Sequence, residues 1–200
     1  MNARYLVWFT AIVAAYHFIS VAQIPTWFGF FLPANSHLAM SISSALILVY
    51  LLLPAGGRKQ GEDTEAEGKL RRVPWYDWLL MVSGVTSASF IIFFHEAFLD
   101  YGEYGFLDPK GIVLALMLAF PVLEAVRRTT GWALPIIILF FVFITLFQQF
   151  LPGLLYGRGY APDRLLYSSY VGDAGIFGLP LGIAANIVII FLVFGALMHR

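Results

Sequence analysis

Residues 132–150 read WALPIIILFFVFITLFQQF, a stretch without a charged side chain. A helix needs about 20 mostly apolar residues to cross roughly 30 Å of hydrocarbon, and this stretch has that length. Apolar and polar residues do not alternate along it, as they would in a strand of a membrane barrel. Because a backbone inside a bilayer has no water to bond to, the stretch must satisfy its own hydrogen bonds as a helix. The sequence therefore predicts a transmembrane helix here.

The rest of the chain repeats this pattern. Of its 200 residues, 60% are hydrophobic and 12% are charged, and no water-soluble fold needs so apolar a surface. The sequence predicts an all-α integral membrane protein, a bundle of about six transmembrane helices. The predicted spans are 5–23, 37–54, 75–94, 111–127, 132–150 and 178–198.

The first span has an alternative interpretation as a signal peptide, because SVA at 20–22 fits a cleavage site. Two large aromatic residues inside the stretch, Trp8 and Tyr16, are unusual for such a peptide, and Arg4 alone makes a thin basic start. We therefore expect this segment to be retained as a span.

Lysine and arginine residues gather on one side of the predicted bundle. Cytoplasmic loops of membrane proteins carry an excess of these residues, which predicts that both termini are cytoplasmic. That side then carries Arg4, Arg58, Lys59, Lys69, Arg71, Arg72, Arg127, Arg128 and Arg200. The opposite side carries only Lys110, Arg158 and Arg164. The polar stretch 55–73 becomes a cytoplasmic linker that is too poor in apolar residues to fold alone.

Positive and negative side chains balance in the chain as a whole, twelve against twelve, so no nucleic-acid partner is expected. Cysteine is absent, which excludes disulfides and thiolate sites. The sequence has no phosphate-binding glycine loop, no nucleophile elbow and no paired carboxylates at membrane depth. We therefore expect that the chain is not an enzyme.

PWYDWLL at 74–80 opens the third span. Trp75, Tyr76 and Trp78 are typical of the aromatic belt at a membrane boundary. Asp77 lies in the first turn, where a negative charge faces the positive end of the helix dipole. We interpret these four residues as interfacial anchors.

The fourth span ends in LEAVRRTTG. Glu124 and Arg128 are four residues apart with the acid first, the favourable order for an ion pair on a helix. The sequence predicts a structural ion pair here, with Gly131 as the helix cap.

Three histidines, His17, His37 and His95, raise the hypothesis of a haem or metal site, because ionisable groups in a membrane are functional candidates. No two of them have the spacing of ligands on one helix, and HEAFLD at 95–100 lacks the second histidine of a zinc-binding HExxH helix. We expect no metal and no cofactor in this segment. A haem or redox protein stays open as an alternative.

GIFGLPLG at 175–182 precedes the last span. Glycine and proline cost a helix interior roughly 1 and 3 kcal/mol relative to alanine, so this start needs a reason. Gly178 and Gly182 would share one helix face and allow another helix to approach closely. We predict a helix-packing interface, partly unwound, formed by Gly175, Gly178, Pro180, Gly182 and Asn186.

Four motifs in order resemble one known family. PWYDWLL (74–80), LEAVRRTTGWALPI (123–136), FLPGLLYGRGY (150–160) and GIFGLPLGIAANIVIIFLVFGALM (175–198) are similar to the first part of the fused membrane subunit of a TRAP transporter. The resemblance is to the kind of TRAP transporter that is paired with a TAXI-type periplasmic binding protein. It is weak over 1–36 and clear from His37 onward.

The resemblance implies two domains. Residues 1–130 would be a four-helix membrane domain like the family's small subunit, and 131–200 the first two helices of the large transport domain, as in an N-terminal fragment. It implies a location in the bacterial cytoplasmic (inner) membrane and a scaffold role in a tripartite, sodium-coupled secondary transporter of organic acids or similar small solutes. The implied partners are the lipid bilayer, the rest of the transport domain and the binding protein, which outer loops would contact. The implied sodium ion would bind outside this segment.

An alternative is a stand-alone membrane scaffold with no transport role. It needs only the bundle and none of the family's partners.

Overall fold

The computed structural model describes residues 3–31, 33–53, 74–153 and 156–198. All regular structure among these residues is helical, as the sequence predicts. The elements are α1 (Ala3–Val21), α2 (Ile24–Trp27), α3 (Ala34–Leu52), α4 (Trp75–Phe93), α5 (His95–Tyr104), α6 (Pro109–Thr130), α7 (Ala133–Phe147), η1 (Gln148–Phe150), α8 (Pro162–Tyr170), α9 (Leu179–Ile183), the π-helix η3 (Ala184–Val188) and α10 (Ile189–Met198).

Five of the predicted spans are helices long and apolar enough to cross a membrane. They correspond to α3, α4, α6, α7 with η1, and the run from α9 to α10. The first predicted span, 5–23, forms α1, whose apolar stretch Leu6–Val21 is shorter. The whole of the predicted linker, 55–73, lies outside the described residues.

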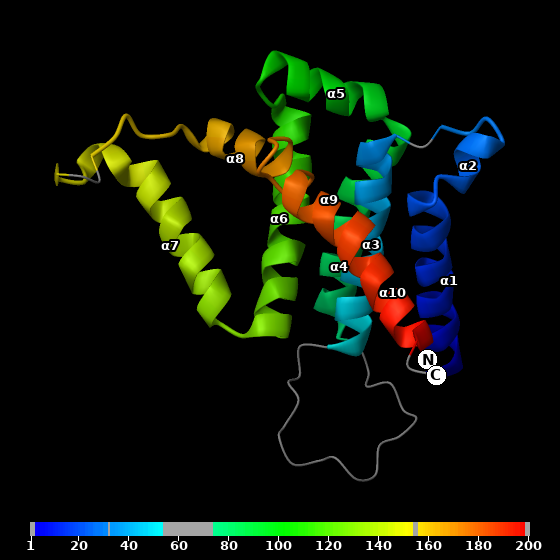
Figure 1. Cartoon of the computed structure of the whole chain (residues 1–200). Coiled ribbons are helices and arrows are strands. Elements are labelled where there is room, and N and C mark those ends of the chain that lie inside the picture. The colour runs from blue at the N-terminus through cyan, green and yellow to red at the C-terminus, as the bar shows by residue number, and fades with distance from the viewer. Residues whose placement is uncertain (1–2, 32, 54–73, 154–155, 199–200) are drawn as a thin grey trace, which may run out of the picture.

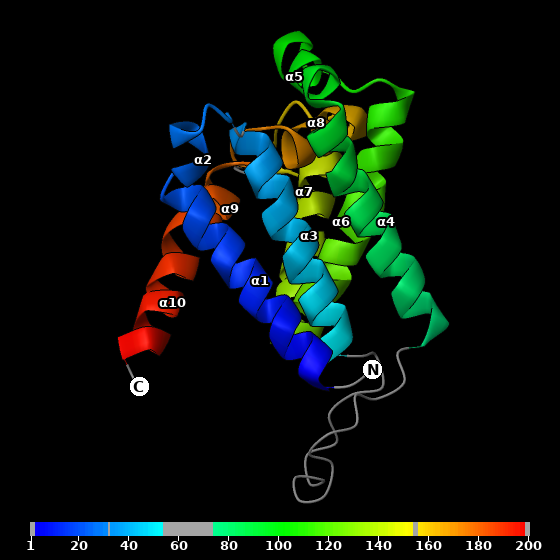
Figure 2. The ribbon, with the colours of Figure 1, turned by 90° about the vertical axis from the view of Figure 1, so that its right-hand side faces the viewer.

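The helices run alternately up and down (Figures 1 and 2). The start of α1, the end of α3, the start of α4 and the end of α10 lie on one side of the bundle. The short helices α2, α5 and α8 lie on the other side. Both described ends of the chain are thus on the same side, the arrangement that an even number of passes requires.

Helices α3, α4 and α6 form a three-helix block that contains most of the buried core. Gly84 on α4 allows the closest approach: a Cβ there would lie 2.7 Å from Cδ1 of Leu46 on α3 and 3.2 Å from Cβ of Pro121 on α6. Small residues at helix crossings have this role in membranes, where no hydrophobic force distinguishes a helix from lipid. The rest of the interface is buried apolar side chains such as Ile91 and Leu118.

Hydrogen bonds between helices add to this packing, and two of them centre on Pro121 inside α6. Proline has no N–H, so the carbonyl of Met117, one turn earlier, loses its usual helix donor. The hydroxyl of Ser83 on α4 donates to that carbonyl at 2.7 Å. The Tyr50 hydroxyl on α3 donates to the carbonyl of Pro121 itself at 3.0 Å. The carbonyl that the proline leaves without its helix donor is thereby satisfied by a neighbouring helix, as a membrane interior requires.

At the end of the bundle opposite the two chain ends, α5 and α8 cover the block (Figure 1). Both helices lie in segments between predicted spans. The rings of Phe98, Tyr170 and Phe177 pack edge to face with centroids 5.4–5.8 Å apart. The Tyr170 hydroxyl lies 3.3 Å from that of Ser87 on α4. This aromatic cluster joins α5 and α8 to the block.

Asp108 caps the first turn of α6. Its carboxylate accepts from the backbone N–H of Gly111 at 2.6 Å and from the Tyr101 hydroxyl at 2.7 Å. These two hydrogen bonds, the Gly111 bond first, hold the pKa of Asp108 below its usual value. Burial and the bond to Asp108 raise the pKa of Tyr101. The N-terminal end of α6 is therefore fixed by a charged cap.

Helix α7 and the run from α9 to α10 differ from this block. Only 6% of the residues along each of these two apolar stretches are buried, against 56% along α3. Side chains such as Phe140, Phe141, Phe191 and Leu192 are more than half exposed. Figure 1 shows α7 splayed away from α6, with its far end reached only by the chain that continues to α8.

Candidate functional site

A buried ion pair joins α4 and α6 at the side of the bundle where the chain begins. One Arg128 nitrogen, Nη2, lies 2.6 Å from Oδ1 of Asp77, and Nη1 lies 2.8 Å from Oδ2. The two side chains are 3% and 0% exposed. Nη1 also donates to the carbonyl of Leu53 at the end of α3, at 3.1 Å. One guanidinium thus binds all three helices of the block.

Glu124 extends the pair into a network. Its Oε1 accepts from Nε of Arg128 at 2.9 Å, the contact that the spacing of four residues predicts. The same carboxylate accepts two bonds of 2.6 Å from Arg127. The Arg128 guanidinium lies over the ring of Tyr50, 4.5 Å from its centroid, and that of Arg127 lies 4.9 Å from the Trp132 ring. Two carboxylates and two guanidinium groups neutralise one another.

The local sequence explains why these charges meet. Asp77 is in the first turn of α4 and Arg128 is in the last turn of α6. The two helices are antiparallel, so both turns lie at one membrane depth. A bidentate arginine–carboxylate bond in a water-poor site is among the stronger polar contacts in proteins, and the arrangement fixes helix ends. Within this network, each of the four charged side chains has a partner of opposite charge.

The structure separates Asp77 from the aromatic residues beside it. Trp75, Tyr76 and Trp78 are 77%, 41% and 49% exposed, so they face outward where a boundary belt would lie. Asp77 is fully buried and faces the block. Its interpretation as an interfacial anchor therefore misses its contact with Arg128, which is 51 residues away in the chain.

The structure places two of the three histidines side by side. The rings of His17 on α1 and His37 on α3 have centroids 5.4 Å apart. Both nitrogens of His17 have partners, the Val13 carbonyl at 2.8 Å and the Ser41 hydroxyl at 2.9 Å. His95 begins α5 and is not in contact with this pair. The described residues include no group of three or more His, Asp or Glu side chains placed to hold a metal ion.

The glycine-rich segment folds on itself before the last span. The amide of Leu179 donates to the Asp173 carbonyl at 2.9 Å, and a side chain at Gly178 would collide with the backbone of Asp173. Pro180 lies in the first turn of α9. The close packing at Gly178 is therefore against the backbone of its own segment.

Gly182, on the far side of the segment, faces open space. A Cβ added there would meet no atom within 4 Å. One turn later, Asn186 donates to the Gly182 carbonyl at 2.8 Å. Helix α9 contacts α3 and the π-helix η3 contacts α1, but no close approach is made at Gly182 itself, and the predicted helix-packing interface stays a prediction.

Sequence reasoning misses Tyr50, Ser83 and Ser87, three polar side chains that bond other helices. The signal was present, because a hydroxyl inside a predicted span needs a partner and a proline in another span leaves a carbonyl free. What the sequence does not supply is the register that brings them together.

No known protein-family model, curated protein or solved structure matches this chain.

Proposed function

We propose that this chain is the scaffold part of a membrane transporter of the TRAP kind, with α1, α3, α4 and α6 forming the scaffold. In this proposal α7 and the run from α9 to α10 belong to the start of the transport domain. The assembly would lie in the bacterial inner membrane and take up organic acids or similar small solutes, delivered by a TAXI-type binding protein and driven by a sodium gradient.

The observation that carries the scaffold role is the bond between Arg128 and Asp77. It fixes α3, α4 and α6 to one another with buried, mutually neutralised charges. A scaffold must resist movement in the bilayer, and a contact that joins three helices suits that role. The two nearly unburied helices fit the same proposal, because they offer long apolar surfaces to other membrane helices.

The transport role is supported by the four sequence motifs that resemble the family. These motifs contain the arginine pair at the end of α6 and the glycine-rich start of α9, and they occur in the family's order and spacing. This support is independent of the packing of the block. The two parts of the proposal therefore need separate tests.

Transport is tested in liposomes. One set of liposomes would hold the whole assembly, purified from its native membrane through a tag on this chain. A second set would hold the 200-residue chain alone. We expect uptake of radiolabelled mono- and dicarboxylates by the assembly only with an inward sodium gradient and the periplasmic binding protein. Uptake by the chain alone would overturn the scaffold role. An assembly whose uptake needs neither sodium nor a binding protein would overturn the transporter assignment.

Sidedness is tested with thiol labelling, which the absence of cysteine makes simple. Gly102→Cys, in α5, is expected to react with an impermeant reagent added outside intact cells. Gly61→Cys, in the predicted cytoplasmic linker, is expected to be protected until the membrane is opened. The reverse pattern would show that the assigned orientation is wrong.

A further inference from the structure

The contact between α1 and α3 is polar and centres on two histidines. Hydrogen bonds cross this interface from Tyr16, His17 and Ser20 of α1 to His37 and Ser41 of α3. His17 is 1% exposed and lies inside the first predicted span. Ionisable groups at such a depth are rare and mark functional sites. The scaffold role does not use this cluster.

The hydrogen bonds of His17 need more protons than its neutral form has. Nδ1 lies 2.8 Å from the carbonyl of Val13, and because a carbonyl only accepts, Nδ1 carries a proton. Nε2 lies 2.9 Å from the hydroxyl of Ser41. That hydroxyl donates its single proton to the carbonyl of His37 at 2.8 Å, so Nε2 of His17 must donate as well. Only the charged form of histidine donates from both ring nitrogens.

Two protonation states fit the same positions of these atoms. In the charged state His17 donates to Val13 and Ser41, and Ser41 donates to the His37 carbonyl, which makes three hydrogen bonds. In the neutral state the Ser41 hydroxyl turns to donate to Nε2, and its bond to the His37 carbonyl is lost. The additional bond, and the strength of bonds donated by a cation, offset part of the cost of burying the charge. Rotation of one hydroxyl therefore accompanies the gain or loss of a proton.

His37 is suited to the neutral form. Its Nδ1 lies 3.2 Å from the Tyr16 hydroxyl and 3.1 Å from that of Ser20. A phenol is a better donor than an imidazole N–H, so Nδ1 accepts and the ring proton is assigned to Nε2. Nε2 has no hydrogen-bond partner among the described residues. The centroids of the two histidine rings are 5.4 Å apart, and two positive charges at that distance repel each other. The pair therefore suits one proton, on His17.

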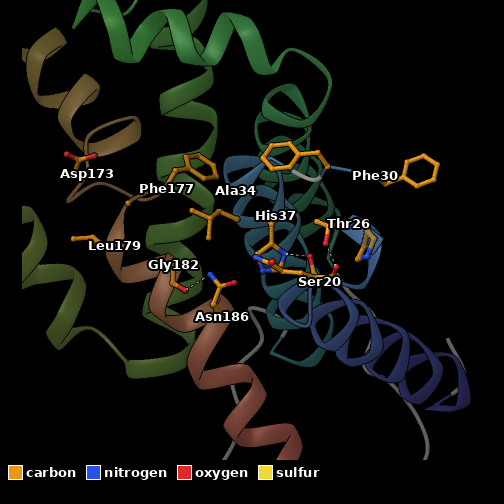
Figure 3. A pocket seen from close by; sticks show the side chains of 15 residues that line it. Ser20, Thr26, Phe30, Ala34, His37, Asp173, Phe177, Leu179, Gly182 and Asn186 are labelled. Carbon is orange, nitrogen blue, oxygen red and sulfur yellow. Dashed lines mark hydrogen bonds between the residues drawn. The ribbon is translucent and has the colours of Figure 1, made fainter. Parts of the chain in front are cut away.

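No carboxylate is placed to balance that proton on the helices around His17. Helices α2 and α3 and the segment Leu179–Met198 contain no lysine, arginine, aspartate or glutamate. The other ionisable groups of the cluster are Tyr16 and His37. Asp173, an exposed acid, lies across a cavity of about 730 Å³ that His37 also lines (Figure 3). Hydrogen bonds therefore hold the proton, and it can reach the cluster from this cavity.

We propose that His17 and Ser41 form a proton-binding site between α1 and α3. The ligand is a single proton, taken from water and bound at Nε2 of His17. When it is bound, the hydrogen bond between the two helices is donated by a cation, and such bonds are roughly twice as strong as neutral ones. Proton binding and the contact between the helices therefore favour each other. The proposal does not depend on the transport role.

NMR of the histidine ring nitrogens, labelled with ¹⁵N in the chain in nanodiscs, tests the site directly. These signals report which nitrogen carries a proton. We expect His17 to be protonated at both nitrogens at about pH 5 and only at Nδ1 at about pH 8, the range in which histidines titrate. His37 is expected to stay neutral with its proton on Nε2. A His17 that stays neutral, a neutral His17 with its proton on Nε2, or a charged His37 at pH 5 would overturn the proposal.

Single variants assign the signals, since the chain has four histidines. His17→Gln is expected to remove the one signal that gains a proton at Nε2. If this variant does not fold, as judged by circular dichroism, His37→Gln, His95→Gln and His199→Gln identify the His17 signal by elimination. A proton gained at a signal that belongs to another histidine, with none at His17, would contradict the assignment.

Two serines of α3 make a matched pair. Ser41→Ala removes the hydroxyl that accepts from Nε2. We expect the ratio of charged to neutral His17 to fall about tenfold at a fixed pH, because a hydrogen bond to a charged group is lost. Ser43→Ala is the control: Ser43 is also buried, and its hydroxyl bonds the Ala39 carbonyl of its own helix at 2.7 Å. We expect no change there, and equal changes in both variants would overturn the role of Ser41.

Spin labels test whether the proton holds the helices together. Ile12 on α1 and Met40 on α3 are 64% and 45% exposed and can carry labels. We expect the distribution of distances between them to be narrower at pH 5 than at pH 8. In His17→Gln the distribution is expected to be independent of pH, and in Ser41→Ala it is expected to depend on pH only weakly. A distribution that does not narrow in acid, or that narrows equally in His17→Gln, would overturn the coupling between proton binding and the helix contact.

Discussion

The helices of the α3–α4–α6 block, α7 and the run from α9 to α10 are all apolar enough to cross a membrane, yet only the block is closely packed. Each of the three block helices contacts the others through a small residue, a hydroxyl or a charge: Gly84, Ser83, Tyr50 and Arg128. Helix α7 has a higher hydropathy and only 6% of its residues are buried. Apolar content inserts a helix into the bilayer, and small and polar residues determine which helices associate.

The largest expected effect is at Arg128. Arg128→Met removes both guanidinium bonds to the buried Asp77 carboxylate, and breaking a buried pair costs about 3–5 kcal/mol. We expect this loss in the free energy of unfolding, measured by denaturant titration in micelles. Arg127→Met is the matched control: its side chain is 28% exposed, and we expect a loss below about 1 kcal/mol.

A double-mutant cycle sharpens this result. Asp77→Asn combined with Arg128→Met should cost less than the sum of the single changes, since the two residues share one contact. Additive losses, or equal losses for Arg127→Met and Arg128→Met, would show that the buried pair does not hold the block.

A smaller effect is expected at the helix crossing. Gly84→Val forces a side chain against the ring of Pro121, and overpacking of this kind costs about 1–3 kcal/mol. Gly195→Val, on α10, meets no atom within 4 Å of its Cβ, and we expect a change within about 0.5 kcal/mol. Thermal unfolding in the same micelles measures both. A similar loss at Gly195 would mean that α10 is packed as tightly as α4.

The cap of α6 contrasts with the start of α7, where Trp132 offers no side-chain cap among the described residues. Asp108→Ala should cost about 1 kcal/mol at neutral pH. The pKa of Asp108 is lower in the folded chain than in the unfolded one. Its stabilisation is therefore complete above the unfolded pKa of about 3.9 and is lost as the pH falls through the folded pKa.

Melting temperatures at pH 7 and pH 3 check this pH dependence. The gap between the unaltered chain and Asp108→Ala should narrow at pH 3. Asp163→Ala, in the first turn of α8, makes no capping bond in the structure and should change little. A gap that widens in acid would refute the role of the charged cap.

The smallest expected effect is at Ser83. Ser83→Ala removes the donor to the Met117 carbonyl, and a hydrogen bond between membrane helices contributes about 0.6 kcal/mol on average. Thr145→Ala on α7 removes a hydroxyl that bonds only its own helix, at the Phe141 carbonyl. We expect no measurable loss of stability there by denaturant titration. Equal effects at both positions would remove the distinction between bonds within and between helices.

The sequence predicts the helical class and most of the spans because these depend on local composition and length. The pair of Glu124 and Arg128 is likewise local, at one helical turn. The contact of Arg128 with Asp77 needs the relative depth of two helices that are far apart in the chain. Opposite charges at the same predicted boundary are compatible with this contact. Apolar periodicity does not predict which way each helix is rotated, so it does not predict that the two side chains face each other.

The short helix α8 and the histidine pair show the same limit. The segment of α8 has glycines on both sides and several aromatic residues, a composition typical of a loop. It is helical in the structure, where Tyr170 packs against Phe98 and Phe177. His17 and His37 lie on different helices, and their contact follows from how α1 crosses α3. A single sequence carries no information on that crossing.

The central claim is that α3, α4 and α6 hold one another while α7 and α10 depend on contacts beyond them. Distances between pairs of spin labels test it most directly, because the chain has no cysteine and single labels can be placed at will. The pair of labels at the exposed positions Leu52 and Val113 measures the distance between α3 and α6. Pairing Val113 with Phe143 measures the distance from α6 to α7, and pairing it with Phe194 measures the distance from α6 to α10. We predict a narrow distance distribution for the first pair and broad distributions for the other two in nanodiscs. Three equally narrow distributions would contradict the account.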